Sequence, residues 1–184
     1  MTTTEKKNNR GSGRARRGKN FENDITRSFK QFERGEDIWW RRIPDFRTWY
    51  NLNKSLNKPR VPGDFEALYR GEFFMLEAKS TISKYFNMDW IKPHQKESLL
   101  RVSECGGHGI ILFSRRGRPV KCRAIPIMEY LHLEALYVQL GRKSIDVSDM
   151  LTLGVELPRL SGMFNLDPLF KPGTGQKKLE DYNG

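Results

Sequence analysis

The sequence predicts an α/β fold in which helices flank a mixed sheet. Apolar residues recur at helical spacing near the N-terminus, two strand-like runs flank a tight turn in the middle of the chain, and further helical and strand-like segments follow. This order of elements is typical of a sheet covered by helices. With 184 residues, the chain is long enough for one such domain with a sizeable core and tails.

The N-terminal region divides into an arm and a helix. Residues 1–18 are rich in Arg, Asn, Thr and Gly and nearly lack apolar side chains, so we expect a disordered basic arm. Residues 19–34 should form the first helix. Its apolar face consists of Phe21, Ile25, Phe29 and Phe32. Glu22 lies in the first turn, where a carboxylate favours the helix N-terminus; capping is its ordinary role, and a role near a metal stays open.

A hairpin is predicted between residues 64 and 79. Two runs rich in aromatic and aliphatic residues flank Arg70-Gly71, where glycine can supply the positive φ of a tight turn. A two-residue loop fixes the pairing, so that Tyr69 faces Glu72. Counting outward, Asp64 falls opposite Glu77.

The two opposed acids predict a metal site. Directly opposed residues of an antiparallel pair lie about 5 Å apart at Cβ, where like charges repel. Lys79 follows Glu77 by two residues and therefore returns to the same face. Paired carboxylates with open positions suit Mg²⁺, and we expect Mn²⁺ to substitute for it. The alternative is a half-exposed hairpin whose acids Asp64 and Glu77 are neutralised by Lys79 and Arg70.

The remaining elements alternate along the chain. We expect strands at residues 37–43, 109–113 and 120–125, a helix at residues 89–105, and a helix beginning at Pro126. His94 and Gln95 lie near the start of the first of these helices. Residues at such positions are usually surface or capping residues, but an amide beside a metal site could orient a water or a phosphate. Residues 139–184 resemble a wrapping extension more than a second domain.

The net charge of +11 is concentrated in two segments. Residues 1–20 contain seven Lys or Arg and one Glu, and residues 41–60 contain six Lys or Arg and one Asp. Two cationic segments on a neutral body favour a polyanion such as nucleic acid as partner, although a basic tail alone is often only a solvated arm. The candidate DNA-binding residues are Arg14, Arg16, Arg17, Arg42, Arg47, Trp49, Tyr50, Lys54, Lys58 and Arg60.

An insertion separates the first strand from the hairpin. Residues 44–62 mix aromatic and basic side chains, a composition suited to stacking on bases and contacting phosphates. The alternative is a loop that packs back on the sheet through its aromatic residues.

Cysteine content and hydropathy both bear on where the protein is expected to reside. Cys105 and Cys122 lack the spacing of a zinc site and should be reduced core thiols. The sequence has no apolar run of about 20 residues and no signal peptide, so we expect a cytoplasmic protein without membrane contact.

The C-terminal tail contains a weak motif. Gln176, Leu179 and Tyr182 have the spacing of a sliding-clamp-binding peptide, but Asn183 stands where a second aromatic residue is expected. An ordinary polar tail is the favoured alternative.

Five segments together resemble the RecU-type Holliday junction resolvases of the PD-(D/E)XK nuclease superfamily. They are residues 18–22 (GKNFE), 62–71 (PGDFEALYRG), 76–81 (LEAKST), 93–95 (PHQ) and 106–113 (GGHGIILF). The resemblance covers residues 18–131 and implies a restriction-endonuclease-like nuclease domain at residues 19–138. The insertion at residues 44–62 stands in the place of the family's stalk, which enters the open centre of a four-way junction. One departure is Val61-Pro62-Gly63, which replaces a threonine-containing segment.

The resemblance also implies the site residues. Asp64, Glu77 and Lys79 would be the catalytic set, supported by Glu22 and Gln95. We expect the metal to be held by Asp64, Glu77 and a backbone carbonyl near Ala78.

The expected function is a homodimeric, Mg²⁺-dependent endonuclease that makes paired symmetric nicks in four-way junctions during DNA recombination and repair. Dimerisation follows from the two-fold symmetry of the junction and from the resemblance. Two alternatives stay open: a nuclease of the same fold that acts on a flap, nick or single strand, and a structure-specific DNA-binding protein that does not cut.

Overall fold

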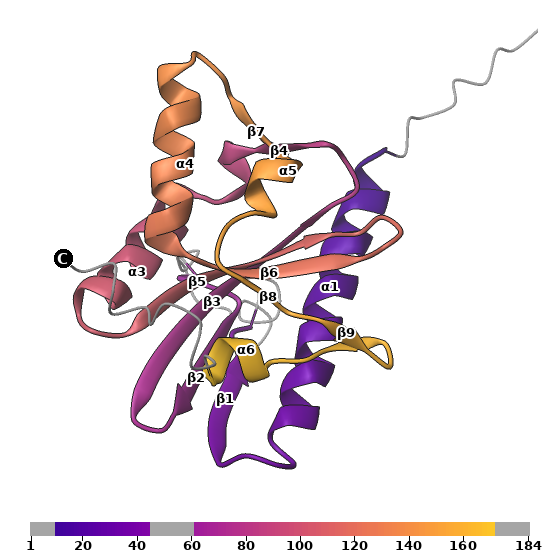
Figure 1. Ribbon diagram of the computed structural model, residues 1–184, viewed down its shortest axis with the longest axis vertical. Coiled ribbons are helices and arrows are strands. Elements are labelled where there is room, and N and C mark those ends of the chain that lie inside the picture. The colour runs from indigo at the N-terminus through magenta and orange to yellow at the C-terminus, as the bar shows by residue number, and fades with distance from the viewer. Residues whose placement is uncertain (1–9, 45–60, 172–184) are drawn as a thin grey trace, which may run out of the picture.

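A mixed six-stranded sheet forms the centre of the protein. The computed structural model describes residues 10–44 and 61–171, with side chains from residue 18 on (Figure 1). The strand order is β1-β2-β3-β5-β6-β8, in which β3 and β5 are parallel and the other neighbours antiparallel. The strands are β1 (Ile38–Arg42), β2 (Phe65–Tyr69), β3 (Glu72–Thr81), β5 (His108–Arg115), β6 (Lys121–Pro126) and β8 (Val155–Glu156).

Three long helices cover the two faces of this sheet. Helix α1 (Arg10–Phe32) lies on one face, and α3 (Pro93–Glu104) and α4 (Ile127–Gln139) lie on the other (Figure 1). Alternation along β3 separates two cores: Leu76 packs in the cluster that contains the apolar face of α1, whereas Met75 packs with residues of α3 and α4. The predicted fold class, a mixed sheet flanked by helices, is confirmed.

Smaller elements complete the molecule. They are β4 (Tyr85–Asn87), the 3₁₀ helix η1 (Met88–Trp90), β7 (Ser144–Asp146), α5 (Val147–Met150), β9 (Arg159–Leu160), β10 (Met163–Phe164) and α6 (Asp167–Phe170). No helix in the described ranges is long and apolar enough to span a bilayer.

Helix α1 begins earlier than predicted. Its first residue is Arg10, so residues 10–18 of the expected disordered arm are helical, while residues 1–9 lie outside the described part. A helix that is already nucleated extends at less cost than a new one, and residues 14–17 have high helix propensity, although the segment also contains three glycines. The packed apolar residues from Phe21 onward supply that nucleus.

The segment after α4 is part of the same core. Strand β8 pairs with β6, and Leu157, Phe164 and Phe170 are buried in the core cluster that contains α1. The Phe170 ring lies 4.8 Å from that of Phe74 and 5.1 Å from that of Phe32, measured between centroids. The sequence boundary expected at residue 138 falls inside α4.

The two cysteines differ in their surroundings. Cys122 is buried, as expected, and burial raises the pKa of its thiol. The prediction of a core position was wrong for Cys105, which caps the C-terminus of α3 and is exposed. Both thiols are free.

Candidate active site

The hairpin of β2 and β3 has the predicted register for the five pairs from Tyr69–Glu72 to Phe65–Leu76. The predicted Asp64–Glu77 pair is not part of this ladder, because Asp64 precedes β2. The turn residues Arg70 and Gly71 both have positive φ, 52° and 84°, as a two-residue hairpin turn requires. Tyr69 pairs with Glu72, and the pairing continues without a slip to the partners Phe65 and Leu76. Because the turn is short and both its residues adopt left-handed conformations, this register is locally determined.

Asp64 is fixed at the end of the hairpin, just before β2 begins. Its backbone amide donates to Leu76 O at 2.8 Å, and its side-chain Oδ2 accepts a hydrogen bond from Ala78 N, also at 2.8 Å. β2 pairs with β3 only as far as Leu76, and the Asp64 carboxylate bonds to the backbone edge of β3 beyond that point. Backbone groups two residues apart on a strand face the same neighbour, so the Ala78 carbonyl is directed toward this edge as well.

Glu77 lies fully buried on the α3 face of β3. Its Oε1 contacts Lys79 Nζ, which comes from the same strand face two residues on. Its Oε2 is buried and has no hydrogen-bond partner among the described residues. A buried carboxylate oxygen without a donor is costly unless a cation or a proton reaches it.

Gln95 connects helix α3 to this carboxylate. It is the third residue of α3, and its Oε1 accepts from Lys92 N at 3.0 Å, which satisfies a backbone donor at the helix start. The Gln95 side chain also helps to lower the pKa of Glu77, against the effect of burial. The helix cap thus orients an amide toward the buried acid.

Glu22 lies on α1 and faces the same region. It forms an ion pair with Arg42 of β1, and its negative charge contributes to a raised pKa at Lys79. The structure therefore brings together all five residues that the resemblance implied, Asp64, Glu77, Lys79, Glu22 and Gln95.

The protonation of this group reflects burial and crowding of negative charge. Burial, followed by the charge of Asp64, raises the pKa of Glu77 from 4.5 to about 8, while Lys79 opposes the rise. Burial also raises the pKa of Asp64, against the charge of Lys79 and the Ala78 amide. Burial lowers the pKa of Lys79, but the charges of Glu77 and Asp64 outweigh it and raise the value overall. The charge of Lys79 therefore opposes the effect of burial at both acids.

A cleft of about 350 Å³ opens beside these residues. Lys79 lies in its wall with a side chain that is 21% exposed, so the ammonium is accessible from the cleft while Glu77 stays buried behind it. The wall is formed by Gly18, Glu22, Ala78, Lys79, Ser80, Thr81, Ile82, Ser83, Trp90 and Lys92. Sequence reasoning missed Trp90 and Lys92, although both directly precede the segment that contains Gln95.

Comparison with known proteins places the chain in a family. Residues 16–164, most of the chain, match the family model described as recombination protein U, RecU. This chain belongs to the RecU family. That is the family of Holliday junction resolvases which the five sequence segments resembled, and the resemblance is confirmed. A search of curated proteins found no match to this chain.

One solved structure that matches this RecU chain is Hjc of Archaeoglobus fulgidus, a Holliday junction resolvase from an archaeal hyperthermophile. The two share 18% sequence identity, with 76% of this chain and 95% of that chain covered and a TM-score of 0.46.

The donor set of this RecU protein fits a divalent cation of the Mg²⁺ type. Within residues 18–44 and 61–171, no cluster of three or more His, Cys, Asp or Glu could hold a metal ion. Asp64, Glu77 and the Ala78 carbonyl offer oxygen ligands only, and the Glu77 Oε2 is without a partner. Mg²⁺ prefers oxygen ligands and keeps several waters, so a small set of protein oxygens suits it.

The predicted DNA-binding residues of this RecU chain are only partly described. Arg42 donates to Asn23 at 3.1 Å and contacts Glu22, so its guanidinium takes part in a contact between β1 and α1. Arg14, Arg16 and Arg17 lie on α1, but their side chains are outside the described residues. The other candidates also lie outside: Arg47, Trp49, Tyr50, Lys54, Lys58 and Arg60 in the insertion. The weak clamp-binding motif of Gln176, Leu179 and Tyr182 lies outside the described residues as well.

Proposed function

We propose that this protein is a divalent-metal-dependent endonuclease that nicks two opposed strands of a four-way DNA junction. Membership of the RecU family of Holliday junction resolvases supports the class of enzyme and of substrate. The observation that carries the chemistry is the unpartnered Oε2 of Glu77 beside Asp64, with Lys79 in the wall of an open cleft. These groups supply a cation-binding oxygen set and a positive charge at one accessible position.

Asp64, Glu77 and the Ala78 carbonyl would hold the metal, and Mg²⁺ is the ion we propose, with Mn²⁺ as a substitute. When bound, the ion would polarise the scissile phosphate and lower the pKa of the attacking water. The protein keeps the two acids in place without it: the Ala78 amide fixes Asp64, and Gln95 and Lys79 orient Glu77. Such preorganisation reduces the cost of assembling the site when DNA arrives.

Lys79 would stabilise the phosphate as water attacks it. The phosphoryl oxygens gain negative charge in the transition state, and a fixed ammonium in a partly dry cleft stabilises that charge. The Lys79 ammonium contacts Glu77, so a cation that binds the acids would free it to face the DNA. Hydrolysis would leave a 5′-phosphate and a 3′-hydroxyl.

A homodimer would supply the second active site. A four-way junction is two-fold symmetric, and two symmetric nicks require two copies of the site related by the same symmetry. The insertion at residues 44–62 of each copy would enter the open centre of the junction, in the manner implied by the family resemblance.

A substrate panel tests the proposed function. The purified protein is incubated with a labelled four-way junction, a linear duplex of the same sequence and a single strand, with Mg²⁺ or with a chelator. We expect paired nicks in the junction alone, and only with Mg²⁺. Preferred cutting of a flap, nick or single strand would indicate a nuclease with another substrate. Junction binding without cutting in any metal would indicate a structure-specific binding protein.

A further inference from the structure

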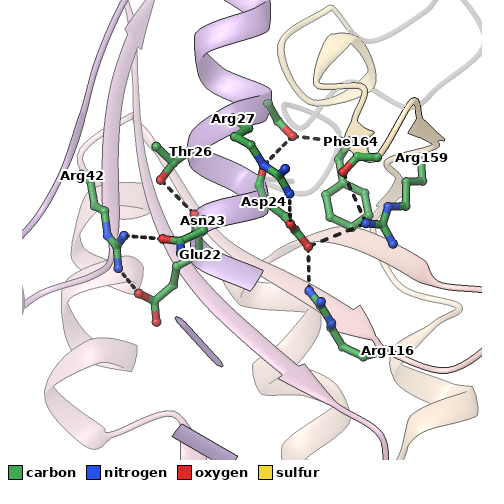
Figure 2. A network of polar contacts seen from close by, with 11 residues as sticks. Glu22, Asn23, Asp24, Thr26, Arg27, Arg42, Arg116, Arg159 and Phe164 are labelled. Carbon is green, nitrogen blue, oxygen red and sulfur yellow. Dashed lines mark hydrogen bonds and ion pairs between the residues drawn. The ribbon is translucent and has the colours of Figure 1, made fainter. Parts of the chain in front are cut away.

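A buried aspartate on α1 gathers three arginines from separate parts of the chain. Asp24 is only 5% exposed, and its partners are Arg27 on the next turn, Arg116 in the loop between β5 and β6, and Arg159 in β9 (Figure 2). Oδ1 accepts from Arg27 Nη2, and Oδ2 accepts from Arg116 Nη1 at 2.8 Å. Arg159 Nη2 stays 4.0 Å from Oδ2. We call these four residues the Asp24 cluster.

The Asp24 cluster has more positive charge than its own acid can balance. Among the described residues, Asp24 is the only carboxylate that pairs with these arginines, which leaves a surplus of two positive charges. Each guanidinium has five N–H donors, and Asp24 uses one of Arg27 and one of Arg116. Arg159 donates to Gly162 O at 3.3 Å. Donors therefore remain for a second anion.

All three arginines can be reached from solvent. Their side chains are 59% exposed for Arg27, 33% for Arg159 and 19% for Arg116, although the acid that holds them is buried. A purely internal ion network would have buried the cations together with the acid. Here the carboxylate lies below and the guanidinium groups extend toward the surface.

The Asp24 cluster adjoins the candidate active site. The backbone amide of Arg116 donates to Thr81 O at 2.8 Å, and Thr81 lies in the wall of the cleft that contains Lys79. On α1, Asp24 follows Glu22 by two residues, and the two side chains leave the helix in different directions (Figure 2). The loop that contains Arg116 therefore joins the cleft wall to the Asp24 cluster at the end of β3.

The neighbouring loop adds charge of the same sign. Residues 115–121 contain four Lys or Arg and no acid. Arg118 and Lys121 are exposed there. Closely spaced cations repel each other, and such a loop is stabilised when an anionic partner approaches.

We propose that the Asp24 cluster binds a backbone phosphate of the same DNA that enters the cleft, with Asp24 as its positioning residue. The proposal rests on the proposed function, since it takes DNA as the substrate. An arginine guanidinium can donate two parallel hydrogen bonds to the oxygens of one phosphate. A buried carboxylate that accepts from some N–H groups of the arginines fixes the orientation of the remaining, solvent-facing N–H groups. The contact reads no sequence; it sets the position of the strand relative to Lys79.

The alternative is that the Asp24 cluster only fastens the C-terminal segment to α1. Ser28 Oγ donates to Asp24 O and accepts from Phe164 N at 2.8 Å, which already joins α1 to β10 beside the cluster. Both roles predict a loss of stability when Arg116 is removed. They differ for Arg27, because an exposed ion pair contributes little to folding whereas a phosphate contact changes the salt dependence of DNA binding.

The test measures DNA affinity against salt concentration in a chelator, for a four-way junction and a linear duplex. The variants are Arg27→Gln and Arg159→Gln. The matched control is Arg101→Gln, because Arg101 is 76% exposed and pairs with Glu104 at the same i,i+3 spacing as Arg27 and Asp24, but lies on α3. We expect each cluster variant to reduce the slope of log affinity against log salt by about 0.9 on both substrates, with the control unchanged.

Unchanged slopes in both cluster variants, with wild-type thermal stability, would overturn the phosphate site and leave a structural role. Arg27→Lys should restore the slope, because it restores the charge, but recover only part of the affinity. The chelator separates this result from the proposed function. If the wild type cuts junctions in Mg²⁺ but the cluster variants keep the wild-type salt slope, only the proposed phosphate site is rejected. If the wild type never cuts but the cluster variants have a reduced salt slope, only the proposed nuclease activity is rejected.

Discussion

Glu77 and Lys79 share one face of β3, and the Lys79 ammonium contacts only one of the two oxygens of the Glu77 carboxylate. The other oxygen, Oε2, is buried without a hydrogen-bond partner in the described part of the chain. Burying half of a carboxylate in this way disfavours its charged form, which agrees with a pKa of about 8. An ionised Glu77 with a buried, unpartnered oxygen destabilises the protein unless a cation binds at this position.

The stability of the metal-free protein should fall as pH rises toward 8. Glu77 keeps its proton to about pH 8 when folded but ionises near 4.5 when unfolded, so the folded state binds more protons in between. The free energy of unfolding then decreases with pH across this window. In a chelator, the midpoint temperature of thermal unfolding should decrease as the pH is raised from about 5 to about 8. The decrease should be smaller in Glu77→Gln. An equal pH dependence in both proteins would show that Glu77 is not the group responsible.

Metal binding should release a proton near neutral pH. A cation binds the ionised Glu77, so below a pKa of about 8 it must displace the proton that the carboxyl carries. The apparent Mg²⁺ affinity is therefore expected to rise with pH and to level off above about 8. Calorimetry in buffers of different ionisation enthalpy would count the proton, and an affinity that does not change with pH would contradict this ligand.

The hairpin was predictable from sequence because its determinants are local. Arg70-Gly71 supplies a two-residue turn, and strand periodicity then places Lys79 on the face of Glu77. The approach of Asp64 to the Ala78 amide follows from the same register. The roles expected for Glu22 and Gln95 came from the resemblance, because neither helix reveals by its own spacing what these residues face. The first-turn position expected for Glu22 was wrong, since α1 begins at Arg10 and Glu22 lies in its interior.

The parts that sequence reasoning missed depend on contacts between distant residues. Asp24 and Arg116 are separated by 92 positions, and Ser28 and Phe164 by 136. No periodicity in a single sequence pairs such positions. The early start of α1 was missed for another reason: residues 10–18 have no apolar face and contain three glycines, so their composition does not indicate a helix.

Lys79 and Lys92 both line the cleft but should differ in their effect on cleavage. Lys79→Ala removes the ammonium beside the acids, and we expect the single-turnover rate to fall about 10²–10³-fold. Lys92 is exposed and donates to Asp89 O at 3.0 Å. An exposed charge acts through water, so Lys92→Ala should cost about fivefold or less. Equal losses would mean that both lysines act only as phosphate contacts.

The aromatic and basic insertion should recognise the branch of the junction. Replacing Arg47, Trp49 and Tyr50 together with alanine is expected to weaken junction binding far more than duplex binding, because unstacked bases are available only at the branch. Competition binding in a chelator measures the two affinities. If the junction affinity and the duplex affinity fell equally, the segment would be a non-specific phosphate contact or a loop packed on the sheet.

The most direct test of the account is single-turnover cleavage of a four-way junction in Mg²⁺ by the wild type, Glu77→Gln and Glu66→Gln. Glu66 lies on the same hairpin but forms its ion pair with Arg41, away from Asp64 and Lys79. It is therefore a matched control. The account predicts that Glu77→Gln binds the junction at least as tightly as the wild type and cuts it at least about 100-fold more slowly, while Glu66→Gln cuts normally. Cleavage by Glu77→Gln at the wild-type rate would contradict it.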